Sequence, residues 1–425
     1  MPKVSMLAEK VRLISVPSDK FKTGIISVSM ALPLDERAAA NALMLFLLKR
    51  SCKEYPDFSM LNGKLDELYG ASVSAGIFKK GDAQVLTMNI SSLDDRFALT
   101  DESIAEQSAE LLAGMIFKPN CKSGSFGAEN LALEKRLLIQ QVEEEFNNKR
   151  TYSFNKCIGH MCQNEPFGRG KYGTVEEINA VKMADVYAAW KNMLSSAVFQ
   201  ITVVGSVQTE KVEKIFTSYF KKIDRTPENL ETKFILKGGR FNRFEERQPV
   251  NQGKLVIGMR AGMSSSRDNI HAVTVMNDIF GRGTYSKLFT NVREKLSLAY
   301  YCNSRLISDK GIVAVEAGID TDKEKKVTAE VLTQLTDLRN GKTEPEILEA
   351  SKLSLKERHT FSTPEEIAAW YGSQIAEEEI FTPEQEVEGI EAVTMEQVCE
   401  AAKKLTIDTI FMLAAQPEED AENED

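Results

Sequence analysis

The stretch VEEINAVKMADVYAAWK, residues 175–191, returns in altered form as VEGIEAVTMEQVCEAAK, residues 387–403. Nine of the seventeen positions are identical, and the offset of 212 residues (387 minus 175) is about half of the 425-residue chain. A strand-like run follows each copy at a similar distance, FQITVVGSV in the first and TIFMLAA in the second. Two amphipathic helices can share alanine, valine and glutamate by chance, but the common order of elements favours a tandem duplication of one domain.

Hydrophobic periodicity predicts the same alternation of strands and helices in both halves. Predicted strands have apolar residues at every second position, as in TGIISVSMALPL, residues 23–34, whereas predicted helices have them three or four apart. Besides a first strand at the N-terminus, further strands are expected at residues 71–78, 84–92, 199–207, 254–262, 298–308, 311–320 and 409–415. Besides the repeated helix, helices are expected at residues 38–51, 58–70, 101–117, 127–150, 268–280, 286–297, 323–341 and 344–362. The predicted fold class is therefore α+β, with two domains that each pack helices on a mostly antiparallel sheet.

The domain boundaries follow from a polar stretch between the two halves. Residues 225–250 are rich in charge and punctuated by glycine and proline, as is typical of a linker. The expected domains are residues 1–224 and 251–425, and the second ends in the acidic tail EEDAENED, residues 418–425, which we expect to be solvated and disordered. Two large domains joined in this way predict a clamshell, and clefts between domains are common ligand sites.

The composition argues against several classes of function. A net charge of −10 and an isoelectric point of about 5.2 repel nucleic acids and anionic membrane surfaces. The longest apolar run, Ala42–Leu48, has seven residues and is too short to span a membrane. The six cysteines form no CxxC pair and the three histidines lie far apart, which argues against disulfides and structural zinc and favours a cytoplasmic protein.

Two segments carry several motifs in an order known from one family. GRGTYSKLFTNVREKLSLAYY, residues 281–301, has a Gly-rich start followed by S-x-L-F, V-R-E-K and L-A-Y. EPFGRGKYGTVEEINAV, residues 165–181, has a Pro-[FY]-Gly turn and a Gly-Thr pair before a helix. Both resemble the M16 family of insulinase- and pitrilysin-like zinc peptidases, and with the repeat the resemblance covers essentially the whole chain. It implies two M16-like domains of the LuxS/metallopeptidase-like type.

The zinc motif of that family is missing. M16 peptidases place H-x-x-E-H on a first-half helix, where the histidines at i and i+4 share one face and bind one ion, and the glutamate acts as general base. Alignment on Glu54–Pro56 puts these three positions at Ala42, Leu45 and Phe46, which are all apolar. A later glutamate ligand of the family matches Glu134, which we expect to be a solvent-exposed helix carboxylate. We therefore expect no zinc and no other cofactor in this chain.

The other half of the family's active site is present. Arg293 and Tyr300 match an Arg/Tyr pair, which implies a guanidinium that binds a substrate carbonyl and a phenol that donates to the oxyanion. Gly281 and Gly283 would let the backbone approach a substrate closely. The alternative is that Arg293 pairs with a neighbouring glutamate and that Tyr300 belongs to the core.

This combination implies a subunit that does not cleave peptides alone. In bacterial two-gene systems of the family, one subunit carries H-x-x-E-H and its partner carries the Arg/Tyr pair. We expect this chain to be the second kind, in a heterodimer that binds an extended peptide by strand addition, although a homodimer stays open. LDELYGASVSAGIFKKGD, residues 65–82, is most similar to the group associated with 5-aminopentanol modification of elongation factor P. The alternatives are a peptide- or protein-binding scaffold with no role in cleavage, and a stand-alone hydrolase of unrecognised chemistry.

Overall fold

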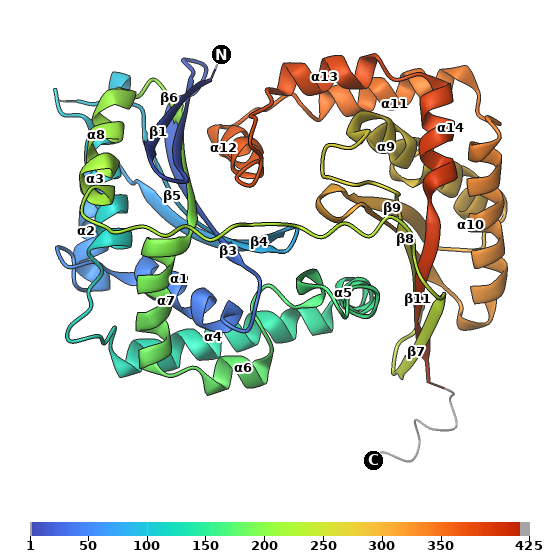
Figure 1. Cartoon of the computed structure of the whole chain (residues 1–425), viewed down its shortest axis with the longest axis horizontal. Helices are drawn as coiled ribbons and strands as arrows, with labels where there is room; N and C mark the ends of the chain where they lie inside the picture. Colours follow the sequence, from blue (N-terminus) through green and yellow to red (C-terminus); the bar gives the residue numbers. More distant parts are fainter. Residues whose placement is uncertain (1, 100, 417–425) are drawn as a thin grey trace. The chain divides into compact units, whose positions relative to one another are not determined.

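The chain folds into two compact units, and neither is continuous in sequence (Figure 1). The computed structural model describes residues 2–99 and 101–416, so the predicted acidic tail lies outside the described residues. Among these described residues, unit 1 combines those within 2–143, 169–231 and 361–382, and unit 2 combines those within 144–168, 232–360 and 383–416. The domain boundaries expected from the repeat remain a prediction. The compact units differ from them because each contains one helical segment from the other half of the chain.

Unit 1 contains a six-stranded sheet that is mostly antiparallel (Figure 1). The strand order is β1 (Lys3–Ala8), β2 (Val11–Pro17), β6 (Val198–Gly205), β3 (Thr23–Pro33), β5 (Ala83–Leu93) and β4 (Ser72–Lys80). Strands β2 and β6 run parallel, and the other neighbours run antiparallel. The N-terminal segment, predicted as one strand, is a hairpin of β1 and β2 that turns at Lys10, whose φ of 52° breaks the extended backbone.

Unit 2 contains a five-stranded sheet with the same topology. The order is β7 (Asn242–Gln248), β11 (Thr406–Ala415), β8 (Gly253–Arg260), β10 (Ile312–Ile319) and β9 (Tyr301–Ile307), and β7 and β11 form the parallel pair. Apart from the extra strand β1, both sheets place their strands in the sequence order first, last, second, fourth, third. The predicted α+β fold of two similar domains is confirmed. Strand β7 falls within the expected linker, so that part of the linker is built into the sheet.

Helices cover one face of each sheet, and a helix from the other half of the chain lies on the opposite face (Figure 1). In unit 1 the helices are α1 (Ala38–Arg50), α2 (Phe58–Glu67), α3 (Ile104–Phe117), α4 (Ala128–Asn147, whose last turn lies in unit 2), α6 (Val175–Ala180), α7 (Met183–Ser196) and α8 (Thr209–Phe220). In unit 2 they are α9 (Ile270–Asn277), α10 (Glu324–Arg339), α11 (Pro345–Glu357), α13 (Pro383–Glu391) and α14 (Met395–Lys404). The exchanged helices are α12 (Pro364–Gly372), which contacts β3 and β6, and α5 (Lys149–Met161), which contacts β8 and β11.

The repeated sequence forms two helices in each half rather than the single helix that its periodicity predicts. Helices α6 and α7 come from the first copy, and α13 and α14 from the second. The break occurs at Lys182 and at Thr394, which have extended backbone angles at the start of α7 and α14. In each case the side chain three residues later accepts a hydrogen bond from that backbone N–H, from Lys182 to Asp185 at 2.7 Å and from Thr394 to Gln397 at 2.9 Å. Such a cap starts a new helix and explains the break.

The unit 1 sheet has two chemically different faces because apolar and polar residues alternate along its strands. In β5, Leu86, Met88 and Ile90 are fully buried in the core under the helices. Thr87 and Asn89, between them, point to the face on which α12 lies, because successive side chains of a strand point to opposite sides. On β5 the face towards α12 therefore carries polar side chains, whereas Ile25 and Val204 on neighbouring strands pack against Ala368 of α12.

Arg12 on β2 anchors the exchanged helix α12 to this sheet. Its guanidinium donates hydrogen bonds to the carbonyl oxygens of Gln374 and Glu377, just beyond α12, at 2.5 and 2.7 Å. It also donates to Oε1 of Gln200 on β6 at 2.8 Å, and Gln200 donates to the carbonyl of Tyr371 at 2.7 Å. Burial lowers the pKa of Arg12 to about 10, so the side chain stays charged at neutral pH. It therefore ties the turn that follows α12 to the sheet.

A buried ion network anchors α5 in unit 2. Arg260 on β8 donates hydrogen bonds to the carbonyl of Met161, the last residue of α5, at 3.0 Å and to the carboxylate of Glu165 at 2.8 Å. Arg260 also contacts Asp408 at 3.0 Å, and Lys310 lies 2.8 Å from the second oxygen of Glu165. Burial acts to raise the pKa of Glu165, but hydrogen bonds from Lys310 and Arg260 hold it below its ordinary value. The glutamate of the EPFG segment therefore fixes the end of α5 to the sheet.

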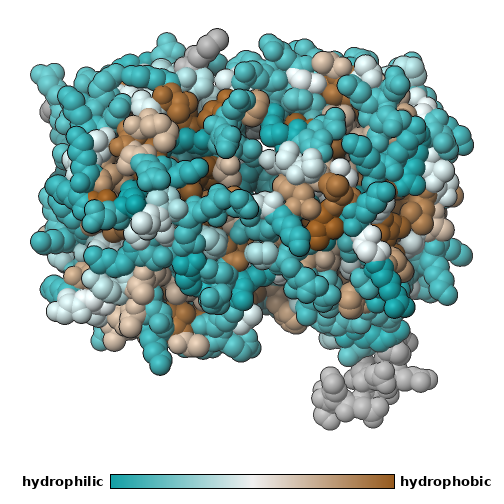
Figure 2. Space-filling model, in the orientation of Figure 1, coloured by the Kyte–Doolittle hydropathy of each residue, from teal (hydrophilic) through white to brown (hydrophobic). Residues whose placement is uncertain are grey.

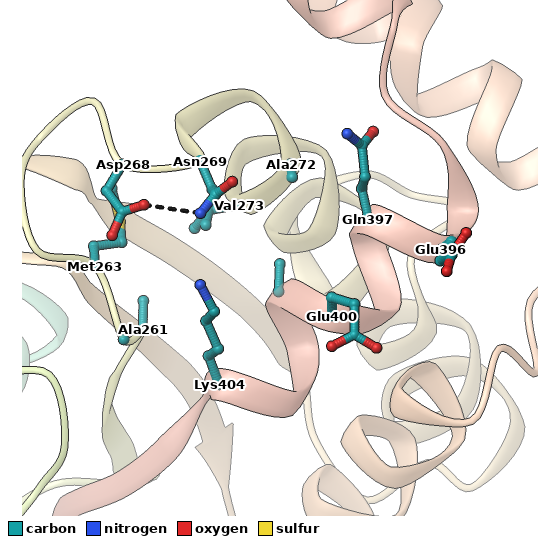
Figure 3. Close-up of a pocket in the computed structure, with 12 residues that line it drawn as sticks. Ala261, Met263, Asp268, Asn269, Ala272, Val273, Glu396, Gln397, Glu400 and Lys404 are labelled. Atoms are coloured by element: carbon teal, nitrogen blue, oxygen red, sulfur yellow. Dashed lines mark hydrogen bonds between the residues drawn. The ribbon is translucent and has the colours of Figure 1, made fainter.

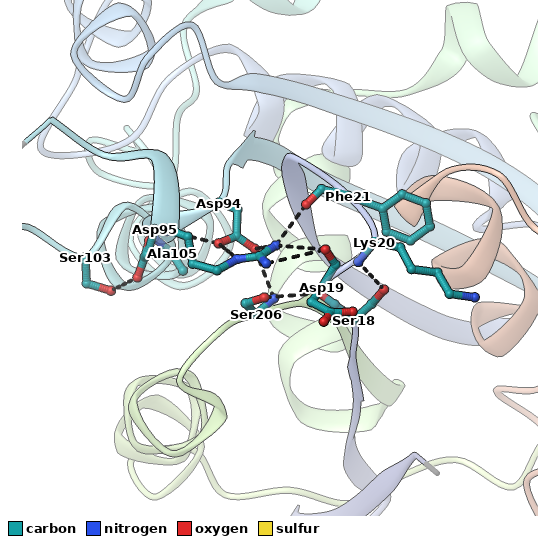
Figure 4. A network of polar contacts seen from close by, with 10 residues as sticks. Ser18, Asp19, Lys20, Phe21, Asp94, Asp95, Ser103, Ala105 and Ser206 are labelled. Atoms are coloured by element: carbon teal, nitrogen blue, oxygen red, sulfur yellow. Dashed lines mark hydrogen bonds and ion pairs between the residues drawn. The ribbon is translucent and has the colours of Figure 1, made fainter.

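Asp94 joins three chain segments at one end of the unit 1 sheet (Figure 4). Its carboxylate accepts hydrogen bonds from the backbone and guanidinium of Arg96 at 3.0 Å and from the backbone N–H of Ser206 at 3.1 Å. Arg96 also donates to the carbonyl oxygens of Asp19 and Phe21, in the connection between β2 and β3. Burial acts to raise the pKa of Asp94, but its bonds with Arg96 hold the pKa below the ordinary value. The network is a structural tie between loops.

The surface is mainly hydrophilic on the side that Figure 2 shows, with hydrophobic residues in small groups. None of the helices in the described part of the chain is long and apolar enough to cross a membrane. Single exposed apolar side chains, such as Leu99 and Met6, are normal on soluble proteins. Phe58 differs from them because it borders a cavity.

Candidate functional site

A cavity of about 600 Å³ lies between α1, α2, α4 and β4 in unit 1. Its apolar lining comes from Phe46 on α1, Leu61 and Leu65 on α2, Val73 on β4 and Leu137 on α4, with Phe58 at 70% exposure. Three helices and a strand thus enclose a mostly apolar space with few charged groups. Its volume falls in the range of about 300–1,000 Å³ that is usual for ligand sites.

The carboxylate that could bind a metal in this cavity, that of Glu134, already forms an ion pair. Nη1 of Arg50 lies 2.8 Å from Oε1 of Glu134, and the Glu134 side chain is only 9% exposed. The expectation that Glu134 is a solvent-exposed carboxylate was therefore wrong. Glu134 lies three residues after Leu131 and four before Leu138, so it shares the buried face of α4.

The helix positions beside Glu134 do not suit zinc. Of the three positions aligned with the zinc motif, Phe46 lines the cavity, whereas Ala42 and Leu45 are fully buried. The cavity face of α1 continues with Lys49 and Arg50, which have the motif's spacing of three and four residues from Phe46. Phenylalanine, lysine and arginine are not zinc ligands. In the described ranges, 2–99 and 101–416, no three His, Cys, Asp or Glu side chains are grouped to hold a metal ion. Zinc does not fit this cavity.

Strand β4 forms an open edge next to the cavity. Within the part of the chain that the structure describes, β4 pairs with β5 alone and ends the sheet. Val73 of β4 lines the cavity, and Ser72 and Ser74 on either side of it point to the opposite face of the sheet. An open edge strand can hydrogen-bond an extended peptide through its backbone.

Arg293 lies in unit 2 on a π-helical segment, Leu288–Lys295, where the sequence predicts an ordinary helix. The wider turn is visible in the hydrogen bond from Leu296 N to the carbonyl of Asn291, five residues earlier, at 3.1 Å. The Arg293 side chain is 43% exposed, and its Nε lies 3.5 Å from Glu294. This loose contact leaves the guanidinium accessible. π-Helical turns occur frequently at functional sites.

Tyr300 is exposed just before the first residue of β9. Its backbone N–H donates to the carbonyl of Gly318 at 2.9 Å, which fixes the residue beside β10. The residue is 63% exposed, and its hydroxyl lies 3.4 Å from Oδ1 of Asp320. The alternative that Tyr300 belongs to the core is therefore wrong, whereas Arg293 does have a neighbouring glutamate.

The two glycines of the predicted site are packed against their own unit. A Cβ added to Gly281 would lie 2.7 Å from the side chains of Leu288 and Ser304, and one added to Gly283 would lie 2.5 Å from the Tyr285 ring. Both glycines are therefore needed for packing inside unit 2. Their close approach to a substrate stays a prediction.

A second cavity, of about 230 Å³, lies between α9 and α14 in unit 2 (Figure 3). Its carboxylate Asp268 accepts hydrogen bonds from the backbone and hydroxyl of Ser264 at 2.9 and 2.8 Å and from Asn269 at 2.8 Å. These hydrogen bonds hold the pKa of Asp268 below its ordinary value, and the bond from the Ser264 backbone has the largest effect. The carboxylate thus stabilises its own loop, and the cavity contains none of the predicted site residues.

Comparison with known proteins supports the family seen in the sequence. Residues 180–355 match the family model of the peptidase M16 inactive domain. This part of the chain therefore resembles an M16 inactive domain. The predicted M16 resemblance is confirmed, whereas the finer resemblance to the elongation factor P group stays a prediction.

The chain also resembles several proteins over nearly its whole length. It is 29% identical over 401 residues to the probable inactive metalloprotease YmfF of Bacillus subtilis, with 94% of each chain covered. A crystal structure of a conserved protein from Enterococcus faecalis has a TM-score of 0.89 at 26% identity and covers 98% of this chain and 99% of that one. The peptidase M16 inactive domain from Pseudomonas fluorescens has a TM-score of 0.78 at 17% identity, with 98% of each chain covered, and shows the shared fold.

Two features of the unit 1 site do not follow from the sequence motifs. Arg50 was missed as the partner of Glu134, although its spacing of four residues from Phe46 places both on one helix face. The polar face of β4 and β5 was also missed, although serine and threonine alternate with apolar residues in SVSAG and LTMNISS. Both patterns can be recognised in the sequence when the residues are assigned to the faces of each helix and strand.

Proposed function

We propose that this chain is a non-catalytic M16-like subunit that binds an extended peptide and supplies Arg293 and Tyr300 to the active site of a zinc-bearing H-x-x-E-H homologue. The family match and the likeness to a probable inactive metalloprotease support the non-catalytic part. The observation that carries the rest is the exposure of both side chains, because the fold of unit 2 leaves the guanidinium and the phenol accessible. The heterodimer and the cytoplasmic location remain predictions.

Each element of the chain has a defined role in this proposal. The open edge of β4 hydrogen-bonds the peptide backbone, and the neighbouring cavity takes an apolar side chain. Arg293 binds a substrate carbonyl or carboxylate through its planar fork of N–H groups. Tyr300 donates its hydroxyl proton in a hydrogen bond to the oxyanion that forms during cleavage. The partner subunit provides the metal chemistry.

The direct test mixes the purified chain with the H-x-x-E-H homologue of the same organism and measures cleavage of a quenched fluorescent peptide. We expect cleavage by the mixture and none by this chain alone. Arg293→Ala and Tyr300→Phe should each reduce kcat by about 100-fold, the usual effect of losing one oxyanion donor. Because both side chains are exposed, neither variant should change the melting temperature.

Two matched controls separate the pair from general effects. Arg240→Ala removes another exposed arginine, and Tyr187→Phe removes the hydroxyl of a tyrosine on α7. Neither should change kcat. If Arg293→Ala and Tyr300→Phe cleave as fast as the parent mixture, the role assigned to the pair is wrong. If a stable complex binds peptide without any cleavage, the chain is a scaffold.

A further inference from the structure

The two sides of strand β4 offer different surroundings to any peptide that pairs with its edge. Val73 faces the apolar cavity of about 600 Å³ between α1, α2 and α4. Ser72 and Ser74 face a separate cavity of about 320 Å³ on the opposite side of the sheet, next to α12. One edge strand therefore lies between an apolar and a polar space.

The polar cavity is built from the side chains of three neighbouring strands. Cross-strand pairing places Ser74 of β4 beside Asn89 of β5, and Asn89 beside Ser27 of β3. The next row contains Thr87 of β5 beside Ser29 of β3. Helix α12 completes the cavity with small residues, and Glu365 at its edge accepts a hydrogen bond from Ser91 at 2.7 Å. The lining thus contains a row of neutral hydroxyl and amide groups, beside the apolar side chains of Ile25 and Phe78.

One of the polar groups in this buried lining needs a hydrogen-bond partner. Ser27 and Ser29 are 6% and 1% exposed. Oδ1 of Asn89 is buried without a partner, whereas its Nδ2 donates to Ser74 at 3.2 Å. Buried polar groups are nearly always hydrogen-bonded, so this cavity is suited to a polar group from outside the chain.

We infer that unit 1 selects extended peptides in which apolar side chains alternate with small, neutral, polar ones. Successive side chains of a strand point to opposite faces, so a peptide strand added to β4 directs every second residue to each cavity. Leucine-like side chains fill the apolar space near Val73, and serine-, threonine- or asparagine-like ones meet the hydroxyl groups near Ser74. This inference rests on the proposed peptide-binding function and adds the class of peptide to it.

Charge and size exclude other residues from the polar side. An acidic side chain would be repelled by Glu365, the one charged residue among those that line this cavity. A large aromatic side chain would have to displace the small residues of α12, Ala368, Ala369 and Gly372. The proposed site therefore selects residues on both faces of the peptide strand. A peptide with the same composition in a different order does not fit it.

Fluorescence anisotropy with labelled synthetic peptides tests the pattern. The peptides have about eight residues, the length of an ordinary strand, and lysines at both ends for solubility. The first alternates leucine and serine, the second has the same residues in two blocks, and the third alternates leucine and glutamate. Burial of a single leucine side chain changes an equilibrium constant by about tenfold or more, so we expect Kd to be at least about tenfold lower for the first peptide than for the others.

A variant of the polar cavity tests where the preference arises. Ser74→Tyr fills the space beside Asn89 and should raise the Kd of the leucine–serine peptide by about tenfold. Ser218→Tyr, on the exposed side of α8, is the matched control and should leave Kd unchanged. Both serines are exposed, so neither change should lower the melting temperature.

The outcomes separate the pattern from the peptide-binding function. Equal affinity for the alternating and block peptides would overturn the alternating pattern while leaving peptide binding intact. If no peptide binds, the proposed function fails and the pattern fails with it. A preference that Ser74→Tyr does not reduce would place the selecting site elsewhere and overturn the role of the polar cavity.

Discussion

Replacing Glu165 with glutamine removes one charge from the buried network that anchors α5. The carboxylate lies 2.8 Å from both Arg260 and Lys310, and all three side chains are at most 2% exposed. Glutamine keeps the shape of the side chain, but the two cations lose the carboxylate that they share. A charge-assisted hydrogen bond contributes about 1.5–3 kcal/mol, and breaking a buried ion pair costs about 3–5 kcal/mol. We expect the free energy of unfolding of unit 2 to fall by about 4 kcal/mol.

Thermal unfolding followed by circular dichroism measures this loss. For a unit of roughly 200 residues, 1 kcal/mol corresponds to about 2–4 °C, so Tm of unit 2 should fall by about 10 °C. Glu388→Gln, on an exposed position of α13, is the matched control and should change stability by less than about 0.5 kcal/mol. A decrease in Tm of less than about 2 °C for E165Q would refute the reasoning, because a buried pair would then contribute little.

The pH dependence of the free energy of unfolding provides a second test of the same variant. The pKa of Glu165 in the folded chain lies below its ordinary value of 4.5. The carboxylate's contribution to stability is therefore fully present above that pH and is lost as the pH falls through the lowered pKa. The difference in stability between parent and E165Q should be constant at neutral pH and should narrow below about pH 4.5. A difference that stays constant in acid would show that the charge is not its cause.

Gly281→Ala should lower the free energy of unfolding by about 2 kcal/mol in urea titrations, because the new methyl group would lie 2.7 Å from Leu288 and Ser304. Gly239→Ala, where nothing lies within 4 Å, should be neutral, and equal stability of the two variants would show that the turn at Gly281 relaxes freely. Arg12→Ala should speed hydrogen exchange in α12 by roughly 100-fold, because it removes three hydrogen bonds from a charged group. Exchange in α5 serves as the internal reference, and unchanged protection of α12 would show that Arg12 does not anchor it.

Local periodicity is enough to predict most of the strands and helices. The predicted strand at 23–34 is β3 (Thr23–Pro33), and the predicted helix at 38–51 is α1 (Ala38–Arg50). Each pattern repeats within its own segment and needs no knowledge of distant contacts. Helix α12 also has a local start signal, since Thr363 and Glu366 form a capping box before the helix. Its position on the sheet of the first half depends on tertiary contacts that no local pattern contains.

The candidate site likewise has features that follow from local sequence and features that depend on tertiary contacts. The lack of zinc ligands on α1 follows from residue types alone, but the ion pair between Arg50 and Glu134 joins positions 84 residues apart. Its formation depends on how α1 and α4 pack. The π-helical form of Leu288–Lys295 is equally hidden, because an extra residue in one turn hardly changes the spacing of apolar side chains. The exposure of Arg293 and Tyr300 follows only from the folded unit.

Because α12 comes from the last part of the chain, the ribosome finishes the strands of unit 1 long before it makes the helix that covers them. At about 5–20 residues per second, the interval between the emergence of β6 and that of α12 lasts roughly 10–30 s. During that interval, the nascent chain exposes the serine-rich face of the sheet together with the apolar residues that later pack against α12. A translation product that stops before residue 361 lacks this cover permanently. Such a fragment is expected to be a target for chaperones and proteases instead of a working half-molecule.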